Sequence, residues 1–380
     1  MRILVALPPF EVYGPATGGA VSTVTLGLAQ AWTRRGHDMV IATAPHQILH
    51  PVGRAIKIDF PRQRQLAPME RLQAGAQRRL RRYDWPDYGH YSREVLRLIA
   101  AENPDRIVVH NDLTLPGLLP TRLRTSTIVH VHNQVAVRDL GRARLGLSQV
   151  GAVVAVSDFI SADIVRRFGQ VRLSTIPNGV DTASFRLEHS TRMVESEPLR
   201  VAFLGRLLYD KGAHVLLDAV ERLQAHGLAL KVSVIGSPDF YRSPSHDEDP
   251  YVRRVRHRVD QLGGQYIPHL DRREVPGVLG RQDILVVPSL FPEPFGLVVL
   301  EGMAAGCVVL ASDIGGLPAS VGSAGHLFPP GDAGALADLL RMLAERPRDR
   351  RLLIAAGRKR ADSHDWSCIA TRWLPLLEAL

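Results

Sequence analysis

The chain has 380 residues, 45% of them hydrophobic, and a mean hydropathy of −0.02, which excludes a disordered or fibrous protein and allows two domains of ordinary size. Its 47 basic and 38 acidic residues give a net charge of +9, which favours anionic partners such as phosphates, nucleic acid or an acidic membrane surface. Cys307 and Cys368 are the only cysteines, which excludes a disulfide framework and a cysteine zinc site; no apolar run approaches the ~18 residues of a spanning helix. We therefore expect a cytoplasmic protein.

Short apolar runs alternate with helical patterns through the first half of the chain. The apolar N-terminal run is too short for a signal peptide and predicts a buried strand of a parallel sheet. A helix is expected roughly over residues 20–35, closed by Gly36. The predicted strands cover residues 3–7, 39–43, 106–110, 127–132 and 152–156.

The second half repeats this scheme, with strands predicted at residues 200–204, 230–235, 283–287 and 308–311. Strands that alternate with helices predict parallel sheets, so we expect an α/β protein of two Rossmann-like domains, residues 1–190 and 191–365. The polar segment 186–198 has no periodicity and suits a linker. Residues 366–380 form an apolar helical face that caps its own domain or packs across on the first one.

A glycine-rich loop at residues 14–20 follows the first predicted strand and opens the first predicted helix. Glycines there let backbone N–H groups approach a phosphate. The spacing is neither the dinucleotide G-x-G-x-x-G nor a Walker A motif, so a plain strand–helix loop is the alternative.

Arg206 and Lys211 follow the first predicted strand of the second half. The carboxyl end of a parallel strand is where such sheets bind ligands, and two cations there can neutralise a diphosphate. The alternative is a solvated basic loop.

The segment 291–301 carries Glu293 and Glu301, eight positions apart around a predicted helix start. Pro294 keeps Glu293 extended, Gly296 permits a close turn, and residues 297–305 predict a short helix. A helix N-terminus binds anions, and the nearby carboxylates suit hydroxyl groups. A nucleotide-sugar combines both features.

Histidines end two strands of the first half, at His110 and at His130-Val131-His132. Each is either a structural residue or, for His132, a partner of a sugar hydroxyl or a departing phosphate. Residues 61–83 carry seven arginines beside a helical apolar stripe. That segment either rests on an anionic membrane surface, receives an anionic acceptor, or is a solvated face.

In order and spacing, these motifs resemble those of retaining glycosyltransferases of family four, which have the GT-B fold. The resemblance spans nearly the whole chain. It implies two facing Rossmann-like domains, with the donor mainly on the second, the acceptor mainly on the first, and the final helix crossing back. It rests on Gly18-Gly19-Ala20, Val156-Ser157, residues 176–181 with Phe185, Gly205-Arg206, Lys211-Gly212 and the pair Glu293 and Glu301.

The resemblance also implies residue roles. Arg206 and Lys211 are expected to bind the donor diphosphate, Glu293 to contact the donor sugar, Glu301 to hold the ribose, and His132 to lie near the reacting sugar. Two departures are His269, where the family often has glycine, and Gly302, which replaces alanine and should only loosen the helix, by under ~1 kcal/mol. The residues expected to take part in catalysis are His132, Arg206, Lys211 and Glu293. The residues expected to bind the donor are Gly18, Gly19, Arg206, Lys211, Glu293, Phe295, Gly296, Leu297, Val298 and Glu301.

The activity implied by the resemblance is retaining transfer of a sugar from a nucleotide-sugar, a UDP-sugar before GDP-mannose, to a hydroxyl of a glycan, lipid or small natural product. No metal, cofactor or nucleic acid partner is expected, and residues 61–83 would supply any peripheral contact with an anionic membrane. A nucleotide-sugar 2-epimerase of GT-B architecture and a non-catalytic nucleotide-sugar-binding subunit are the alternatives.

Overall fold

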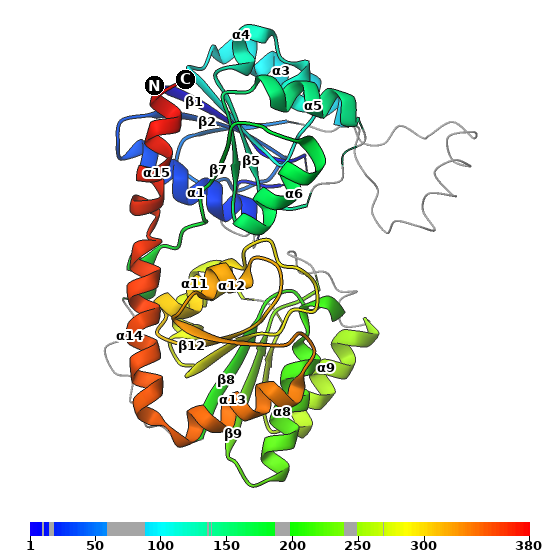
Figure 1. Ribbon diagram of the computed structural model, residues 1–380, viewed down its shortest axis with the longest axis vertical. Coiled ribbons are helices and arrows are strands. Elements are labelled where there is room, and N and C mark those ends of the chain that lie inside the picture. Colours follow the sequence, from blue (N-terminus) through cyan, green and yellow to red (C-terminus); the bar gives the residue numbers. More distant parts are fainter. Residues whose placement is uncertain are drawn as a thin grey trace, which may run out of the picture.

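In the computed structural model, two α/β domains lie one above the other, each a parallel sheet with helices on both faces (Figure 1). The structure describes residues 1–9, 11–14, 19–58, 88–134, 137, 139–186, 198–238, 249–268 and 270–380. Within these ranges, no helix has the length and apolar character needed to cross a membrane.

The first sheet has seven parallel strands in the order β3-β2-β1-β4-β5-β6-β7. Its central strands are the predicted ones. The two edge strands, β3 and β7, were not predicted, because they are short and only partly buried and so lack an apolar run. The strands are β1 (Arg2–Ala6), β2 (Asp38–Thr43), β3 (Arg54–Lys57), β4 (Arg106–His110), β5 (Thr127–Val131), β6 (Ala152–Ala155) and β7 (Leu173–Thr175).

The second sheet has six parallel strands in the order β10-β9-β8-β11-β12-β13. All four predicted strands are present, and the two edges, β10 and β13, are again the additions. In both sheets the order reverses beside the first strand of the domain, which is where doubly wound sheets form a ligand crevice. The strands are β8 (Leu199–Leu204), β9 (Leu230–Ile235), β10 (Gln265–Ile267), β11 (Ile284–Val287), β12 (Val308–Ser312) and β13 (Gly325–Phe328).

The described helices cover both faces of each sheet. In the first domain they are α1 (Ala20–Thr33), α3 (Tyr88–Glu102), α4 (Thr121–Arg124), α5 (Leu140–Gln149) and α6 (Asp158–Phe168), with the 3-10 turn η1 (Leu115–Leu118). The short helix α7 (Thr182–Arg186) follows them and packs on helices of the second domain. In the second they are α8 (Ala213–Ala225), α9 (Pro250–Gln261), α10 (Val275–Leu279), α11 (Leu297–Ala304), α12 (Leu317–Val321) and α13 (Ala333–Glu345), with η2 (Tyr209–Lys211) and η4 (Arg272–Glu274).

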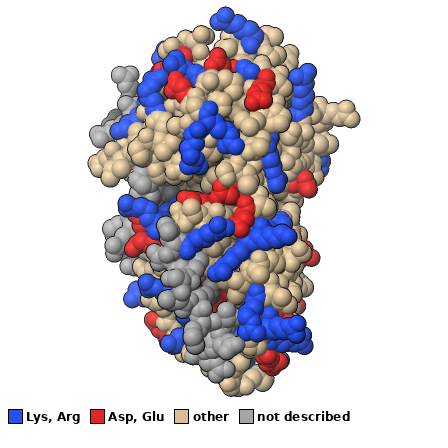
Figure 2. Space-filling model, turned by 90° about the vertical axis from the view of Figure 1, so that its left-hand side faces the viewer, with Lys and Arg blue, Asp and Glu red and all other residues tan. Residues whose placement is uncertain are grey.

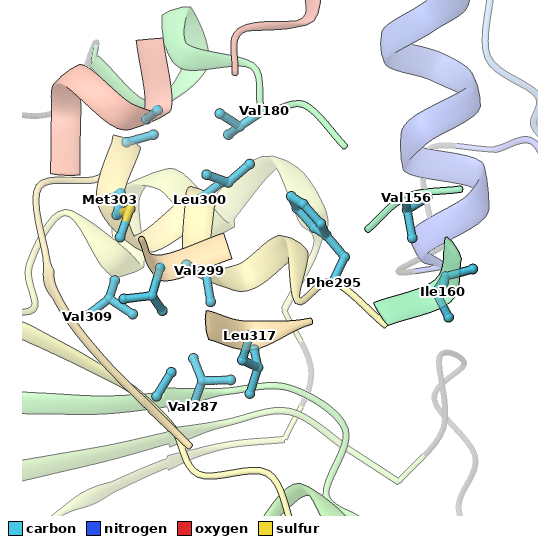
Figure 3. Packing of buried hydrophobic residues seen from close by; sticks show 14 of the residues in the cluster. Val156, Ile160, Val180, Val287, Phe295, Val299, Leu300, Met303, Val309 and Leu317 are labelled. Atoms are coloured by element: carbon cyan, nitrogen blue, oxygen red, sulfur yellow. The ribbon is translucent and has the colours of Figure 1, made fainter. Parts of the chain in front are cut away.

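One hydrophobic cluster runs through the contact between the domains. Phe295, 4% exposed, lies between α11 and the segment of the first domain that carries Val156 and Ile160 (Figure 3). Ser157 adds a polar contact, because its Oγ donates to the backbone oxygen of Pro294 at 2.5 Å. The start of α11 is therefore held by both domains.

The chain returns to the first domain through its last two helices, α14 (Pro347–Ser363) and α15 (Trp366–Glu378). Trp373 of α15 packs edge-on against Trp32 of α1, with ring centroids 5.5 Å apart. Where the chain crosses, the Val180 N–H donates to the backbone oxygen of His364 at 2.9 Å. The predicted GT-B arrangement with a helix crossing back is confirmed, while the boundary at 190/191 falls outside the described residues and stays a prediction.

The face that carries α14 and α15 shows Lys and Arg side chains over both domains, with Asp and Glu side chains among them near the middle (Figure 2). The described part of this face is therefore mixed in charge. The arginine-rich segment 61–83, predicted to contact a membrane or an anionic acceptor, lies outside the described residues.

Candidate functional site

A pocket of about 690 Å³ lies between the two domains. The first domain contributes loops that follow β1 and β5, and the second contributes loops that follow β8, β9 and β11. The carboxyl ends of the two sheets therefore face each other across this space, as doubly wound folds place their ligands.

Lys211 and Glu293 form an ion pair inside the pocket. The Nζ of Lys211 donates to Oε1 of Glu293 at 2.6 Å, and the Oγ of Ser289 donates to the same oxygen at 2.8 Å. Lys211 also lies over the ring of Phe291, 4.4 Å from its centroid. Both charged side chains are largely buried, so in the absence of a ligand each one neutralises the other.

The backbone of Glu293 is held by two glycines that the sequence analysis did not single out. Gly316 N–H donates to the oxygen of Glu293 at 2.6 Å. Gly315 has φ +63°, and a Cβ there would lie 2.5 Å from the same oxygen. Larger residues would push the 315–316 segment away, so these glycines fix the position of the Glu293 carboxylate.

The helix α11 points its N-terminus into the pocket. Gly296 adopts a left-handed conformation, φ +83°, and no side chain caps the helix among the described residues. Leu297 and Val298 line the pocket at this end. The first backbone N–H groups of α11 are thus available to an anionic ligand.

Glu301 pairs with Arg272, a residue that the sequence analysis missed. The guanidinium of Arg272, in η4, donates to Oε1 of Glu301 in a short contact, and both side chains line the pocket. Arg272 lies in a single 3-10 turn, which is too short for any periodicity to mark a charged side chain as functional. Its pairing with Glu301 depends on how η4 packs against α11.

The structure explains why glycine stands at position 302, and the explanation is not the expected loosening of the helix. A Cβ at position 302 would lie 2.4 Å from Cδ2 of Leu285 on β11. The glycine therefore lets α11 approach the sheet closely. The other departure, His269, lies outside the described residues.

Three buried histidines lie together beneath the pocket, at the carboxyl ends of β4 and β5. His110 of β4 and His130 of β5 are register partners, and His132 follows directly after the end of β5. The Nδ1 of His110 and the Nε2 of His132 are 2.8 Å apart and share a hydrogen bond. Burial lowers the pKa of all three rings, that of His110 to about 3, so they are neutral near pH 7.

Among the described residues, these three imidazoles are close enough to hold a metal ion, because one ring nitrogen of each lies within 4.8 Å of the others. Two imidazoles on one zinc ion have nitrogens about 3.4 Å apart, since each bond is about 2.1 Å long in a tetrahedral site. The 2.8 Å between His110 and His132 is shorter and is the length of a hydrogen bond. The observed arrangement therefore orients His132, which is the one of the three that lines the pocket.

Glu11 is a second residue that the sequence analysis missed. It follows β1 and lines the pocket next to Gly19. Ser22 N–H donates to its Oε1 at 2.9 Å, and burial raises the pKa of the carboxyl group. A single Glu before a glycine-rich loop carries no sequence signal that would separate it from a surface residue.

The structure brings together nearly all of the residues predicted for the site, although their roles stay predictions. Gly18 lies outside the described residues, and Phe295 contributes to the interdomain core as well as to the pocket wall. The predicted residues found around the pocket are Gly19, His132, Arg206, Lys211, Glu293, Phe295, Gly296, Leu297, Val298 and Glu301.

Known families match both halves of the chain. The model described as Glycosyltransferase Family 4 matches residues 17–184, and the model described as Glycosyl transferases group 1 matches residues 187–360. Two solved structures share the fold over essentially their whole length. A glycosyltransferase from Rickettsia africae has a TM-score of 0.74 at 17% identity, covering 100% of this chain and 98% of its own; the Anabaena protein HepE, solved with UDP and glucose, has a TM-score of 0.71 at 19% identity, covering 99% of both.

Two similar curated proteins differ in how much of their length is matched. Glycogen synthase of Mycobacterium tuberculosis is 31% identical over 226 residues, which are 58% of this chain and 52% of the relative, so the match spans about half of that enzyme. Phosphatidyl-myo-inositol mannosyltransferase of Propionibacterium freudenreichii is 30% identical over 395 residues, covering 97% of this chain and 92% of the relative. With the matched families and the GT-B fold, this similarity over the whole length shows that the chain belongs to the family 4, group 1 glycosyltransferases.

Proposed function

We propose that this chain transfers a sugar, with retention of configuration, from a nucleotide-sugar to an acceptor hydroxyl. A UDP-sugar is the favoured donor and GDP-mannose the second candidate, and the hydroxyl belongs to a glycan, a lipid or a small natural product. The observation that carries the proposal is the set of charges around one pocket wall. Arg206, Lys211 and the N-terminus of α11 suit a diphosphate, and Glu293 and Glu301 suit the hydroxyl groups on either side of it.

The relatives support this choice of donor in different ways. HepE was solved in complex with UDP and glucose, and the P. freudenreichii relative is named a mannosyltransferase. The first shares the GT-B fold with this chain and the second shares its family, and both therefore support a nucleotide-sugar as the donor. In this proposal the domain of residues 191–365 binds the donor, and the domain of residues 1–190 binds the acceptor.

The chemistry breaks the bond between C1 of the sugar and the phosphate oxygen and forms a bond from C1 to the acceptor oxygen. The transition state resembles an oxocarbenium ion, and negative charge builds on the leaving diphosphate. Arg206, Lys211 and the first amides of α11 would stabilise that charge where it develops. In the proposal these groups suffice without a metal ion.

Retention without a covalent intermediate requires the acceptor to attack from the face that the diphosphate leaves. The acceptor proton then passes to the leaving phosphate oxygen. Neither Glu293 nor Glu301 acts as the base in this scheme. Glu293 orients the donor sugar, Glu301 holds the ribose, and neutral His132 lies beside the reacting sugar.

A direct test begins with binding. The protein is heated with UDP-glucose, UDP-N-acetylglucosamine or GDP-mannose, with and without EDTA; a ligand at a hundred times its dissociation constant adds about 2.7 kcal/mol of stability. We expect one of them to raise the melting temperature in both conditions, Arg206→Ala to abolish the shift, and Arg281→Ala, at an exposed position outside the pocket, to retain it.

The second step follows the bound donor by proton NMR during slow hydrolysis. We expect the released sugar to keep the α configuration of its donor. A β product would contradict retention, loss of the thermal shift in EDTA would contradict metal independence, and conversion of UDP-N-acetylglucosamine to its 2-epimer would favour the epimerase.

A further inference from the structure

The strand β4 is followed by a left-handed residue, Asn111, which lies beside the strand that leads to His132. The N–H of Asn111 donates to the backbone oxygen of His130 at 3.0 Å, and this bond continues the parallel ladder between β4 and β5. In that ladder the next bond would run from the N–H of His132 to the backbone oxygen of Asn111. Asn111 instead has φ +57°, which ends the extended conformation that the ladder needs.

The side chain of Asn111 completes the ladder in place of its backbone. The N–H of His132 donates to Oδ1 of Asn111 at 2.7 Å. Because the partner is a donor, the amide oxygen and not the amide nitrogen must face it. Asparagine also suits this position because it enters the left-handed region more readily than most residues with a side chain. One residue therefore turns the chain away from the sheet and still holds His132 in line with β5.

The neighbours of Asn111 in the chain keep this turn in place. The ring of His110, which precedes it, is 1% exposed and shares the 2.8 Å hydrogen bond with Nε2 of His132. Oδ1 of Asp112, which follows it, accepts from the N–H of Thr114 at 2.9 Å and so fixes the chain that leads into η1. The contact between Asn111 and His132 is thus part of a turn that is hydrogen-bonded on both sides.

We propose that Asn111 is a positioning residue for the transfer reaction, because it fixes the main chain of His132 at the pocket wall while His110 fixes the ring. The inference rests on the proposed function, in which His132 lies beside the reacting sugar. His132 lines the pocket and Asn111 does not, so Asn111 acts through His132. A misplacement of about 1 Å can slow an enzymatic reaction about a hundredfold. The nucleoside diphosphate, which is proposed to bind on the other domain, should not be affected.

Asn111→Gly removes the oxygen and keeps the backbone, because glycine readily adopts φ +57°. The test uses the nucleotide-sugar that stabilises the wild type, out of UDP-glucose, UDP-N-acetylglucosamine and GDP-mannose. We expect its hydrolysis at saturation, followed by proton NMR, to slow by about ten- to a hundredfold, while calorimetry shows the dissociation constant of UDP or GDP changed by less than about twofold. Asn111→Asp, which keeps an oxygen in the same place, should retain most of the rate. Asn103→Gly is the matched control, because Asn103 is also left-handed, with φ +43°, but exposed and outside the pocket; it should alter neither quantity.

A second background separates positioning from a general loosening of the domain. In His132→Ala, Asn111→Gly should lower the remaining rate by less than about twofold, because the ring whose position it fixes is absent. An unchanged rate in Asn111→Gly, an equal loss in both backgrounds, or no recovery in Asn111→Asp would overturn the inference. A wild type that binds none of the three nucleotide-sugars, or a His132→Ala variant with the full rate, would instead contradict the proposed function and remove the inference with it.

Discussion

Lys211 and Glu293, 82 positions apart, meet with their charged atoms 2.6 Å apart on the pocket wall that is proposed to bind the donor. Their attraction stabilises the protein without a ligand, and it also competes with any phosphate for the Lys211 ammonium. Breaking a largely buried pair by removing one partner leaves the other charge uncompensated.

We therefore expect Lys211→Met to cost about 2–3 kcal/mol of unfolding free energy, which urea denaturation would measure. The double variant with Glu293→Gln should recover most of this loss, because no charge is then left alone. Donor binding should stay weak in both variants. Recovery of donor binding together with stability would show that Lys211 has no part in holding the diphosphate.

The pair between Arg272 and Glu301 predicts a coupling in nucleotide binding. Arg272→Ala should weaken donor affinity by about 1–2 kcal/mol, because Glu301 loses the group that orients it. In a Glu301→Ala background the same change should matter less, and a double-mutant cycle by calorimetry measures the difference. Glu301→Ala should weaken donor binding more than it slows transfer at saturating donor; the opposite division would contradict its role at the ribose.

Gly302 gives a test that is independent of function. Gly302→Ala should destabilise the protein by about 1–3 kcal/mol, because the added Cβ would lie 2.4 Å from a methyl group of Leu285. Gly334→Ala in α13 is the matched control. Its Cβ would meet only side-chain atoms at 3.2 Å, so the usual helical preference for alanine should leave it neutral or slightly stabilising. Equal effects of the two changes in urea denaturation would refute the packing explanation.

Trp373 should be among the most costly residues to truncate. It is 1% exposed and makes T-shaped ring contacts with both Trp32 and His130. Trp373→Ala is expected to cost about 3–5 kcal/mol, and proteolysis should then release α15 before the rest of the chain unfolds. The neighbouring exposed change Arg372→Ala should leave stability and proteolysis as they are.

The buried histidines predict a loss of stability in mild acid. Burial keeps their pKa values below the ordinary 6.5, so the unfolded chain binds protons that the folded chain does not. Stability should then fall as the pH drops below about 6.5, and continue to fall towards pH 3 for His110. Between pH 6.5 and 5, protonation of His110 in the unfolded chain lowers the free energy of unfolding by about 2 kcal/mol. The variant His110→Asn should show a shallower dependence in urea denaturation, and an unchanged slope would place the sensitivity elsewhere.

The central strands and the site motifs could be predicted because each leaves a local trace. A buried parallel strand is an apolar run, and Pro294 and Gly296 mark the start of α11 by their backbone preferences. The edge strands β3, β7, β10 and β13 leave no such trace, because they are short and only partly buried. The partners of the site charges could not be predicted either. Arg272 meets Glu301, and Glu11 meets Gly19, only after distant segments have packed together.

The chain crosses between the domains twice, and hydrogen bonds join the two crossing segments to each other. The N–H of Val180 donates to the backbone oxygen of His364, and Oγ1 of Thr182 donates to the carboxylate of Asp365 at 2.7 Å. Trp366 fills the space left by two glycines, Gly27 and Gly179, where a Cβ would approach its ring to 2.2 Å and 2.6 Å. Both connections therefore lie at one edge of the molecule, and a rotation of one domain against the other must turn about this edge. Such a hinge would widen or narrow the pocket mouth while α15 moves with the first domain.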